Sequence, residues 1–148
     1  MMPLRFILVG VGARSRVWRR VLDKHPDCVL VGLVEHETDR LNAALIDAPD
    51  VVGALTLDEI TEQVDADVAL LCTPPTNRHN QIAAACRAEL AILAEKPLAD
   101  TLADAEVYVA EAAAAGVPLS VGLNFRYLAV TQELKKLFAP NRLGRPEF

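Results

Sequence analysis

Residues 4–15 read Leu-Arg-Phe-Ile-Leu-Val-Gly-Val-Gly-Ala-Arg-Ser, an apolar run that ends in a turn with two glycines. The run at 4–9 is typical of a buried strand, and residues 15–24 carry apolar side chains at three- and four-residue spacing, as an amphipathic helix does. Glycine permits a tight turn at Gly10 and leaves Gly12 without a Cβ. The stretch therefore predicts a strand, a glycine turn and a helix.

The same alternation of apolar strands and amphipathic helices continues along most of the chain. We expect further strands at 28–34, 51–55, 68–72, 91–94 and 119–121, and further helices at 38–48, 56–64, 76–89 and 101–115. Strands that alternate with helices favour crossover connections and a sheet that helices cover on both faces. The sequence therefore predicts a doubly wound α/β domain of the Rossmann type, with a mainly parallel sheet of six strands.

Composition narrows the class of protein. The chain has 148 residues, 52% of them hydrophobic, and a net charge of -5. The length fits one domain, the acidic balance argues against a nucleic-acid partner, and no apolar run approaches the roughly 18 residues that cross a membrane. Cys28, Cys72 and Cys86 lie in apolar segments without metal-ligand spacing, which favours reduced core thiols in a cytoplasmic protein and no metal site.

The glycine turn has the chemistry of a dinucleotide site. Its candidate cofactor-binding residues are Gly10, Gly12, Ala13, Arg14 and Ser15. A diphosphate can approach the backbone at Gly12, and the N–H groups at the start of the helix attract its negative charge. Ser15 stands where a third small residue lets helix and strand pack closely. Paired glycines can also serve only as a sharp bend, so the turn needs support from its context.

Glu35 supplies that support, because it ends the second expected strand. A carboxylate there can accept hydrogen bonds from both ribose hydroxyls of an adenosine and would repel a 2′-phosphate. We therefore predict NAD as the cofactor, with NADP possible because His36, Arg40 and Arg14 could offset the repulsion. The alternatives are a solvated turn at 35–37 and, for Arg40, either stacking on the adenine or a surface position.

Residues 73–79 follow the fourth expected strand at the edge of the sheet where ligands bind. Pro74 belongs to a rigid loop of two prolines, and the side chains of Thr73 and Asn77 can hydrogen-bond a ribose or a carboxamide. Alternatively, Thr76 or Asn77 caps the next helix. His79 fits a helix surface better than a catalytic role.

Glu95-Lys96-Pro97 ends the fifth expected strand at the same edge. Lys96 could exchange a proton with a substrate if burial or cationic neighbours lowered its pKa, or it could stay charged and position a hydroxyl. A salt bridge that caps the strand end is the structural alternative.

Together, residues 9–15, 73–79, 95–97 and 122–127 resemble the nucleotide-binding half of the Gfo/Idh/MocA oxidoreductases, the glucose-fructose oxidoreductase and inositol dehydrogenase family. The resemblance covers residues 5–144. It implies bound NAD or NADP and a sugar, cyclitol or related polyol as substrate. It also implies that Lys96 is the catalytic residue, in contact with the reacting hydroxyl and the nicotinamide ribose. By the same resemblance, the residues that border the cofactor are Thr73, Asn77, Glu95 and Asn124.

The resemblance also implies a second α+β domain that a chain of this length does not include. We expect residues 1–122 to form the dinucleotide-binding domain and residues 123–148 to form a helix and a tail that lead toward the absent substrate domain. The expected helix at 127–138 has one apolar side, made of Tyr127, Val130, Leu134, Leu137 and Phe138. This side either lies back on the sheet or meets a second domain or another subunit, and we expect a homo-oligomer through it.

The sequence thus leads to the cofactor domain of an oxidoreductase that transfers a hydride between a nicotinamide cofactor and a polyol hydroxyl, with truncation and inactivity of the isolated chain left open. A non-catalytic nucleotide-binding module, sensing or structural, is the alternative. A methyltransferase also places glycines after its first strand, but it gives no reason for Glu95-Lys96-Pro97.

Overall fold

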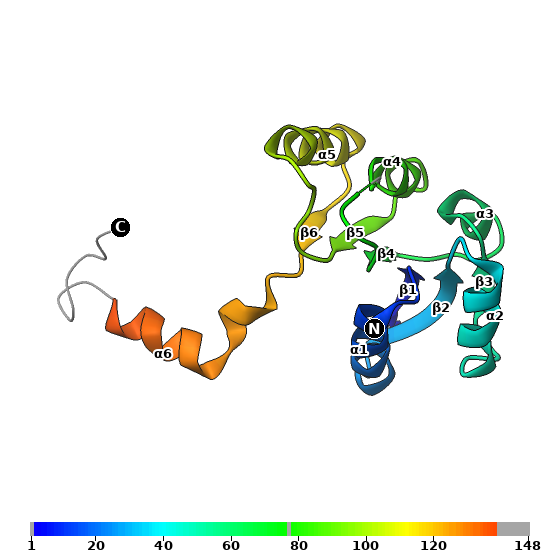
Figure 1. Cartoon of the computed structure of the whole chain (residues 1–148), viewed down its shortest axis with the longest axis horizontal. Coiled ribbons are helices and arrows are strands. Elements are labelled where there is room, and N and C mark those ends of the chain that lie inside the picture. Colours follow the sequence, from blue (N-terminus) through cyan, green and yellow to red (C-terminus); the bar gives the residue numbers. More distant parts are fainter. Residues whose placement is uncertain (1, 77, 139–148) are drawn as a thin grey trace.

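One twisted sheet forms the centre of the computed structural model, which describes residues 2–76 and 78–138 (Figure 1). The strands in the described residues are β1 (Leu4–Val9), β2 (Cys28–Val34), β3 (Val52–Ala54), β4 (Val68–Leu71), β5 (Ala91–Ala94) and β6 (Leu119–Val121). They lie in the order β3-β2-β1-β4-β5-β6, and every neighbouring pair is parallel. The predicted doubly wound, six-stranded fold is confirmed.

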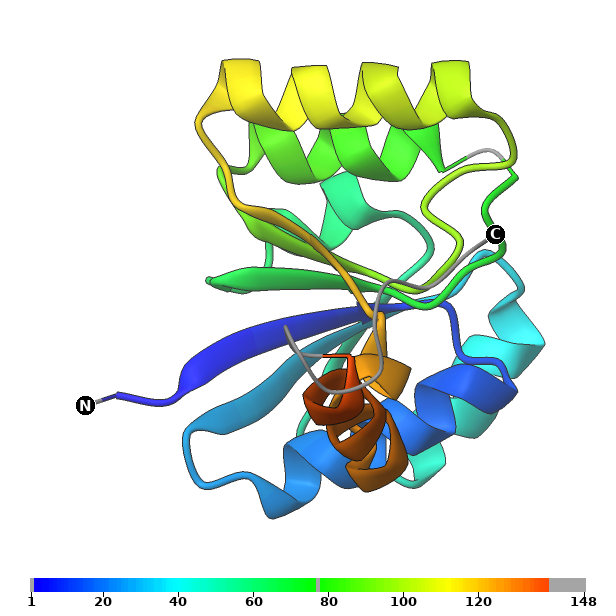
Figure 2. The ribbon, with the colours of Figure 1, turned by 90° about the vertical axis from the view of Figure 1, so that its left-hand side faces the viewer.

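Helices cover both faces of this sheet (Figure 2). On one face lie α1 (Ala13–Lys24) and α2 (Thr38–Ile46), and on the other lie α3 (Leu57–Thr61), α4 (His79–Arg87) and α5 (Leu102–Ala115). Because side chains alternate along a strand, Phe6 and Leu8 of β1 pack in one core with Leu22, whereas Ile7 and Val9 pack in the other with Ile82. Among the described helices, none has the length and apolar character of a membrane span.

Capping contacts mark the two ends of α5, close to the predicted range 101–115. Thr101 is the N-cap residue, and its hydroxyl oxygen accepts a hydrogen bond from the backbone N–H of Asp104 at 3.1 Å. Gly116 ends the helix in the left-handed conformation, with φ of 72°. Short-range capping chemistry therefore sets this helix correctly from the sequence.

The helix expected at 76–89 is shorter than predicted, because α4 spans only His79–Arg87. Arg78 is its N-cap residue, and the Thr76 hydroxyl instead donates to Oδ2 of Asp100 at 3.0 Å. The interpretation of Thr76 as the cap is therefore wrong. At the other end Glu89 adopts a positive φ of 54°, which stops the helix where glycine is more usual.

The chain leaves the sheet after β6. A short 3-10 helix, η1 (Asn124–Tyr127), and α6 (Ala129–Leu137) extend away from the sheet on the β6 side (Figure 1). The helix expected at 127–138 begins later because Leu128 has an extended backbone. Its apolar side is exposed, with Tyr127 76% and Val130 62% accessible, so the alternative that it lies back on the sheet is wrong. Residues 139–148 lie outside the described residues.

The register of the strands aligns the loops that carry the candidate site. Val9 pairs with Val34 on one side and Leu71 on the other, and Leu71 pairs with Ala94. From β1 the sheet grows in both directions, toward β2 and β3 on one side and toward β4 on the other. Open α/β sheets bind ligands at such a change of direction, because the loops on its two sides diverge there. The first residues beyond this aligned row are Gly10, Glu35, Cys72 and Glu95.

Candidate functional site

A cleft of about 660 Å³ opens at the carboxyl ends of β1, β2, β4 and β5. It brings together nearly all the residues predicted from the sequence: Gly10, Gly12, Ala13, Arg14, Glu35, Arg40, Thr73, Pro74, Glu95, Lys96 and Asn124. Of the remaining two, Ser15 is buried beneath the glycine turn, and Asn77 lies outside the described residues. The cleft is also lined by four residues outside the predicted cofactor-binding set: His36, Cys72, Pro75 and Phe125.

The two glycines of the turn meet different requirements. Gly10 has a φ of +88°, and a Cβ there would lie 3.0 Å from Cγ2 and 3.2 Å from the backbone nitrogen of Thr73. The fold itself therefore requires glycine at this position. Gly12 has a φ of -74°, and a Cβ there would have only Nη2 of Arg40 nearby, at 3.9 Å. The chain conformation does not require glycine at Gly12, and its bare Cα leaves open space at the cleft.

The start of α1 is suited to bind an anion. Gly12 is the N-cap residue and the first turn of α1 contains no acidic residue, so no side chain competes for its N–H groups. The hydroxyl of Ser15 donates to the carbonyl oxygen of Gly12 at 2.6 Å, and the side chain is buried. Ser15 thus fixes the turn from below, while the helix N-terminus faces the cleft.

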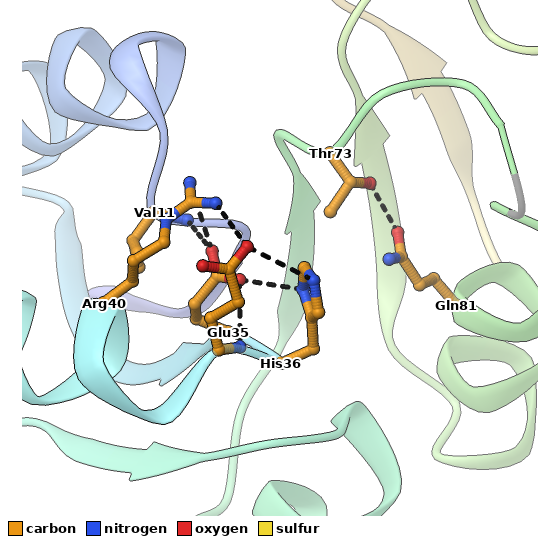
Figure 3. Close-up of polar contacts among 7 residues, drawn as sticks. Val11, Glu35, His36, Arg40, Thr73 and Gln81 are labelled. Atoms are coloured by element: carbon orange, nitrogen blue, oxygen red, sulfur yellow. Dashed lines mark hydrogen bonds and ion pairs between the residues drawn. The ribbon is translucent and has the colours of Figure 1, made fainter.

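Glu35 is a buried, hydrogen-bonded carboxylate and not part of a solvated turn. Its Oε2 accepts a hydrogen bond from the backbone N–H of Val11 at 3.1 Å (Figure 3). Its Oε1 accepts a hydrogen bond from the N–H of Glu37 at 3.3 Å. Nδ1 of His36 lies 2.8 Å from Oε1. These bonds join the end of β2 to the glycine turn and hold the carboxylate at the cleft.

Arg40 lies beside this carboxylate. Its Nη2 is 3.6 Å from Oε2 of Glu35, and its Nη1 donates to Oε1 of Glu37 at 3.1 Å (Figure 3). Ligand atoms of Glu35, His36 and Glu37 lie within 4.8 Å of one another, as a metal site would need. Since the guanidinium of Arg40 already supplies positive charge to both carboxylates, we do not assign a metal to this cluster.

A side-chain hydrogen bond connects the loop after β4 to α4. The Thr73 hydroxyl donates to Oε1 of Gln81 at 2.6 Å (Figure 3). Gln81 also lines a smaller cavity of about 330 Å³ between α3 and α4, which Val34 lines as well. His79 lies on the surface of α4 against the ring of Tyr108, as the helix-surface interpretation predicts.

Glu95 and Lys96, neighbours in the chain, lie in different surroundings. Glu95 is buried, and its Oε1 accepts hydrogen bonds from Nε of Arg14 at 2.5 Å and from Nε1 of Trp18 at 2.7 Å. The salt bridge at the strand end is therefore Arg14–Glu95, and among the described residues Lys96 takes no part in one. Lys96 is exposed and lines the cleft.

Arg78 is the central residue that the sequence analysis missed. Its guanidinium is buried, and it donates to the backbone carbonyls of Thr73, Glu95, Pro97 and Leu98. Burial lowers the pKa of Arg78 from its usual value, and negative neighbours such as Glu95 oppose that effect. An arginine in a polar loop ordinarily indicates an exposed side chain, so no local signal reveals this one.

Cys72 stands beside the cleft as a neutral group. Burial, followed by the charge of Glu95, raises the pKa of Cys72 to about 12. The thiol therefore stays protonated at neutral pH and is no nucleophile there. All three cysteines are free and half-buried, so the expected core position of the thiols is only partly met.

Comparison with known proteins gives three findings. A model of the Gfo/Idh/MocA group, described as an oxidoreductase family with an NAD-binding Rossmann fold, matches residues 4–123. The chain is 28% identical to 1,5-anhydro-D-fructose reductase of Ensifer adhaerens over 96% of its own length and 43% of that protein. It is 32% identical to D-apiose dehydrogenase of Paraburkholderia graminis, over 94% of the chain and 37% of that protein.

A solved structure is similar to this chain in both sequence and fold. The WlbA dehydrogenase from Bordetella pertussis, in complex with NADH and UDP-GlcNAcA, superposes with a TM-score of 0.90 at 28% identity, over 97% of this chain and 44% of that one. The chain thus spans about two fifths of the length of the relatives it matches.

The contrast between the two glycines is testable by stability. Gly10→Ala should lower the free energy of unfolding by about 3 kcal/mol, because a Cβ is strained at positive φ and presses on Thr73. Gly12→Ala, the matched control, should cost less than about 1 kcal/mol. Urea unfolding of both variants measures the difference, and equal losses would contradict the assignment.

Proposed function

Because this chain belongs to the Gfo/Idh/MocA oxidoreductase family and has its NAD-binding Rossmann fold, we propose that the cleft binds NAD and serves hydride transfer to or from a sugar, cyclitol or related polyol. One observation carries the proposal: the buried Glu35 carboxylate and the uncapped start of α1 line the same cleft. They are the two groups that an adenosine diphosphate needs, an acceptor for ribose hydroxyls and donors for the phosphates.

The adenosine end follows from the position of Glu35. Its carboxylate has acceptor capacity beyond the two backbone N–H groups that it already binds, and we assign that capacity to the ribose hydroxyls. The smaller cavity between α3 and α4 is lined by Val34, the residue before Glu35. That adjacency supports the cavity as the place for the base attached to this ribose.

The diphosphate belongs at the glycine turn. Gly12 and Ala13 present backbone at the start of α1, and Arg14 adds a positive charge beside it. The open space that a Cβ at Gly12 would occupy supports a close approach of the phosphates to the backbone. Glu95 and the ring of Trp18 hold the Arg14 guanidinium in place near this turn.

Charge at the adenosine end favours NAD over NADP. Arg40, the arginine nearest to Glu35, contacts both Glu35 and Glu37. Two negatively charged carboxylates therefore surround one guanidinium, which leaves little positive charge to attract a 2′-phosphate. NADP binding remains the second possibility, since His36 lies beside the same carboxylate.

We assign the nicotinamide end of the cofactor to the residues that follow β4 and β5. NAD supplies the chemistry, because its nicotinamide ring accepts or gives the hydride. The chain supplies a border made of Thr73, Pro74, Asn77, Glu95 and Asn124, and it supplies Lys96 as the catalytic residue. The exposed ammonium of Lys96 lines the cleft, where it can hold the substrate hydroxyl and take part in moving its proton.

The substrate class rests on the relatives. One acts on an anhydro-sugar and another on apiose, by their names, which supports a sugar or polyol for this chain. We further propose residues 1–122 as the dinucleotide-binding domain and residues 123–148 as a segment that leads toward a substrate domain. The exposed side of α6 supports self-association, and the free cysteines are compatible with a cytoplasmic location.

The proposed function first predicts selective binding of the cofactor. Titration of the chain, followed by nicotinamide fluorescence, should show NADH bound at least about tenfold more tightly than NADPH, because Glu35 and Glu37 repel the 2′-phosphate. Glu37→Gln should narrow this ratio, and Asp65→Asn, a remote exposed carboxylate, should leave it unchanged. A preference for NADPH would mean that His36, Arg40 or Arg14 outweighs Glu35.

Catalysis by Lys96 is the second prediction. In the protein assayed with a polyol that it oxidises, Lys96→Ala should lower kcat by about 100-fold or more, because the proton-handling group is lost. The Kd for NADH should change by less than about threefold. Lys24→Ala, at an exposed position on α1, is the control. Comparable losses in turnover and affinity would defeat the catalytic role.

Self-association through α6 is the third. The unmodified chain should form dimers or larger species at high concentration in light scattering, because Val130 and Leu134 present an uncovered apolar side. Val130→Glu should shift the chain toward monomer, whereas Glu133→Gln on the same helix should not. A clean monomer of the unmodified chain at high concentration would count against this contact.

A further inference from the structure

The guanidinium of Arg78 lies in the interior with backbone carbonyls around it. Nη1 donates to the carbonyl oxygens of Glu95 at 2.8 Å and of Pro97 at 2.7 Å, and it also approaches that of Leu98 at 3.0 Å. Nη2 donates to the carbonyl oxygen of Thr73. Only 1% of the residue is accessible. Among the described residues, every hydrogen-bond acceptor of Arg78 is a backbone carbonyl, not a carboxylate.

Burial of this guanidinium without a carboxylate partner costs free energy of folding. A buried cation without a paired carboxylate loses its hydration, and hydrogen bonds to neutral carbonyls replace only part of it. Nε of Arg78 is also buried without a partner among the described residues. The four carbonyl contacts hold two loops together, one after β4 and one after β5, which border the same cleft.

The carbonyls that Arg78 binds flank Lys96. Glu95 precedes Lys96, and Pro97 follows it, so the backbone on both sides of the lysine is anchored to one guanidinium. The side chain of Lys96 is exposed, and no hydrogen bond or ion pair within the described residues holds its ammonium. Because no side-chain contact holds the ammonium, the region that it can reach depends on the position of the Lys96 backbone.

We propose that Arg78 is a positioning residue that aims Lys96 at the nicotinamide end of the cleft, by clamping the carbonyls on both sides of it. This role rests on the proposed contact between Lys96 and the nicotinamide ribose. It adds a residue outside the cleft, on the N-cap of α4, to the machinery of the reaction.

The test measures where the Lys96 ammonium lies when the cofactor is bound. The chain is treated with sulfo-N-hydroxysuccinimide acetate, and acetylation of Lys96 is followed by mass spectrometry, with exposed Lys24 as the internal reference. The rate is compared without ligand, with saturating NADH, and with saturating ADP, which has no nicotinamide. Binding of NADH is measured separately by nicotinamide fluorescence.

In the unmodified chain, NADH should slow acetylation of Lys96 by about tenfold or more, and ADP should have little effect. Arg78→Met should still bind NADH within about threefold, yet lose most of the protection of Lys96. Arg78→Lys keeps one charge and should recover part of it. Arg20→Met removes an exposed arginine from α1 that lines neither cavity, and this variant should behave as the unmodified chain.

The failures are distinguishable. If the unmodified chain fails to bind NADH, or binds it without protection of Lys96, the proposed function is wrong at the nicotinamide end. If Lys96 is protected in the unmodified chain and equally in folded Arg78→Met and Arg78→Lys, the positioning role is overturned. If neither variant folds, as thermal melting would reveal, Arg78 stabilises the fold as a whole and the specific role is likewise overturned.

Discussion

The register of four parallel strands is the constraint on which the rest of this structure depends. Val9, Val34, Leu71 and Ala94 form one aligned row across the sheet, so the residue after each of them emerges at the same edge. In strands buried on both faces, a slip by one residue would exchange the side chains that pack in the two cores, which consist of different residues. The packing of the two cores therefore fixes where the loops that follow these four strands leave the sheet.

Two buried carboxylates then hold the glycine turn from opposite sides. Glu35 binds the backbone N–H of Val11, and Glu95 binds the side chains of Arg14 and Trp18. Buried carboxylates are tolerated only when they are hydrogen-bonded or paired, and both meet this condition through residues of the turn or of α1. The turn is thus fixed on the Glu35 side and on the Glu95 side together, which leaves the start of α1 facing the cleft between them.

The sequence predicts the features that depend on local chemistry. Apolar periodicity located the strands and the helix at 101–115, and the end of the second apolar run located Glu35. It could not predict Arg78, because the burial of that guanidinium depends on carbonyls of residues 95–98, which come near it only in the folded sheet. It likewise could not place α6, because an amphipathic pattern states which side is apolar and not what covers it.

The two glycines separate what the fold needs from what a ligand needs. Gly10 is required by its own backbone conformation and by the contact with Thr73. Gly12 has a conformation that any residue adopts, at a position where serine, threonine or aspartate would cap the helix better. A glycine there sacrifices helix stability and keeps both the space and the N–H groups of α1 available. The open space and the uncapped N–H groups at Gly12 fit the diphosphate that we propose for this cleft.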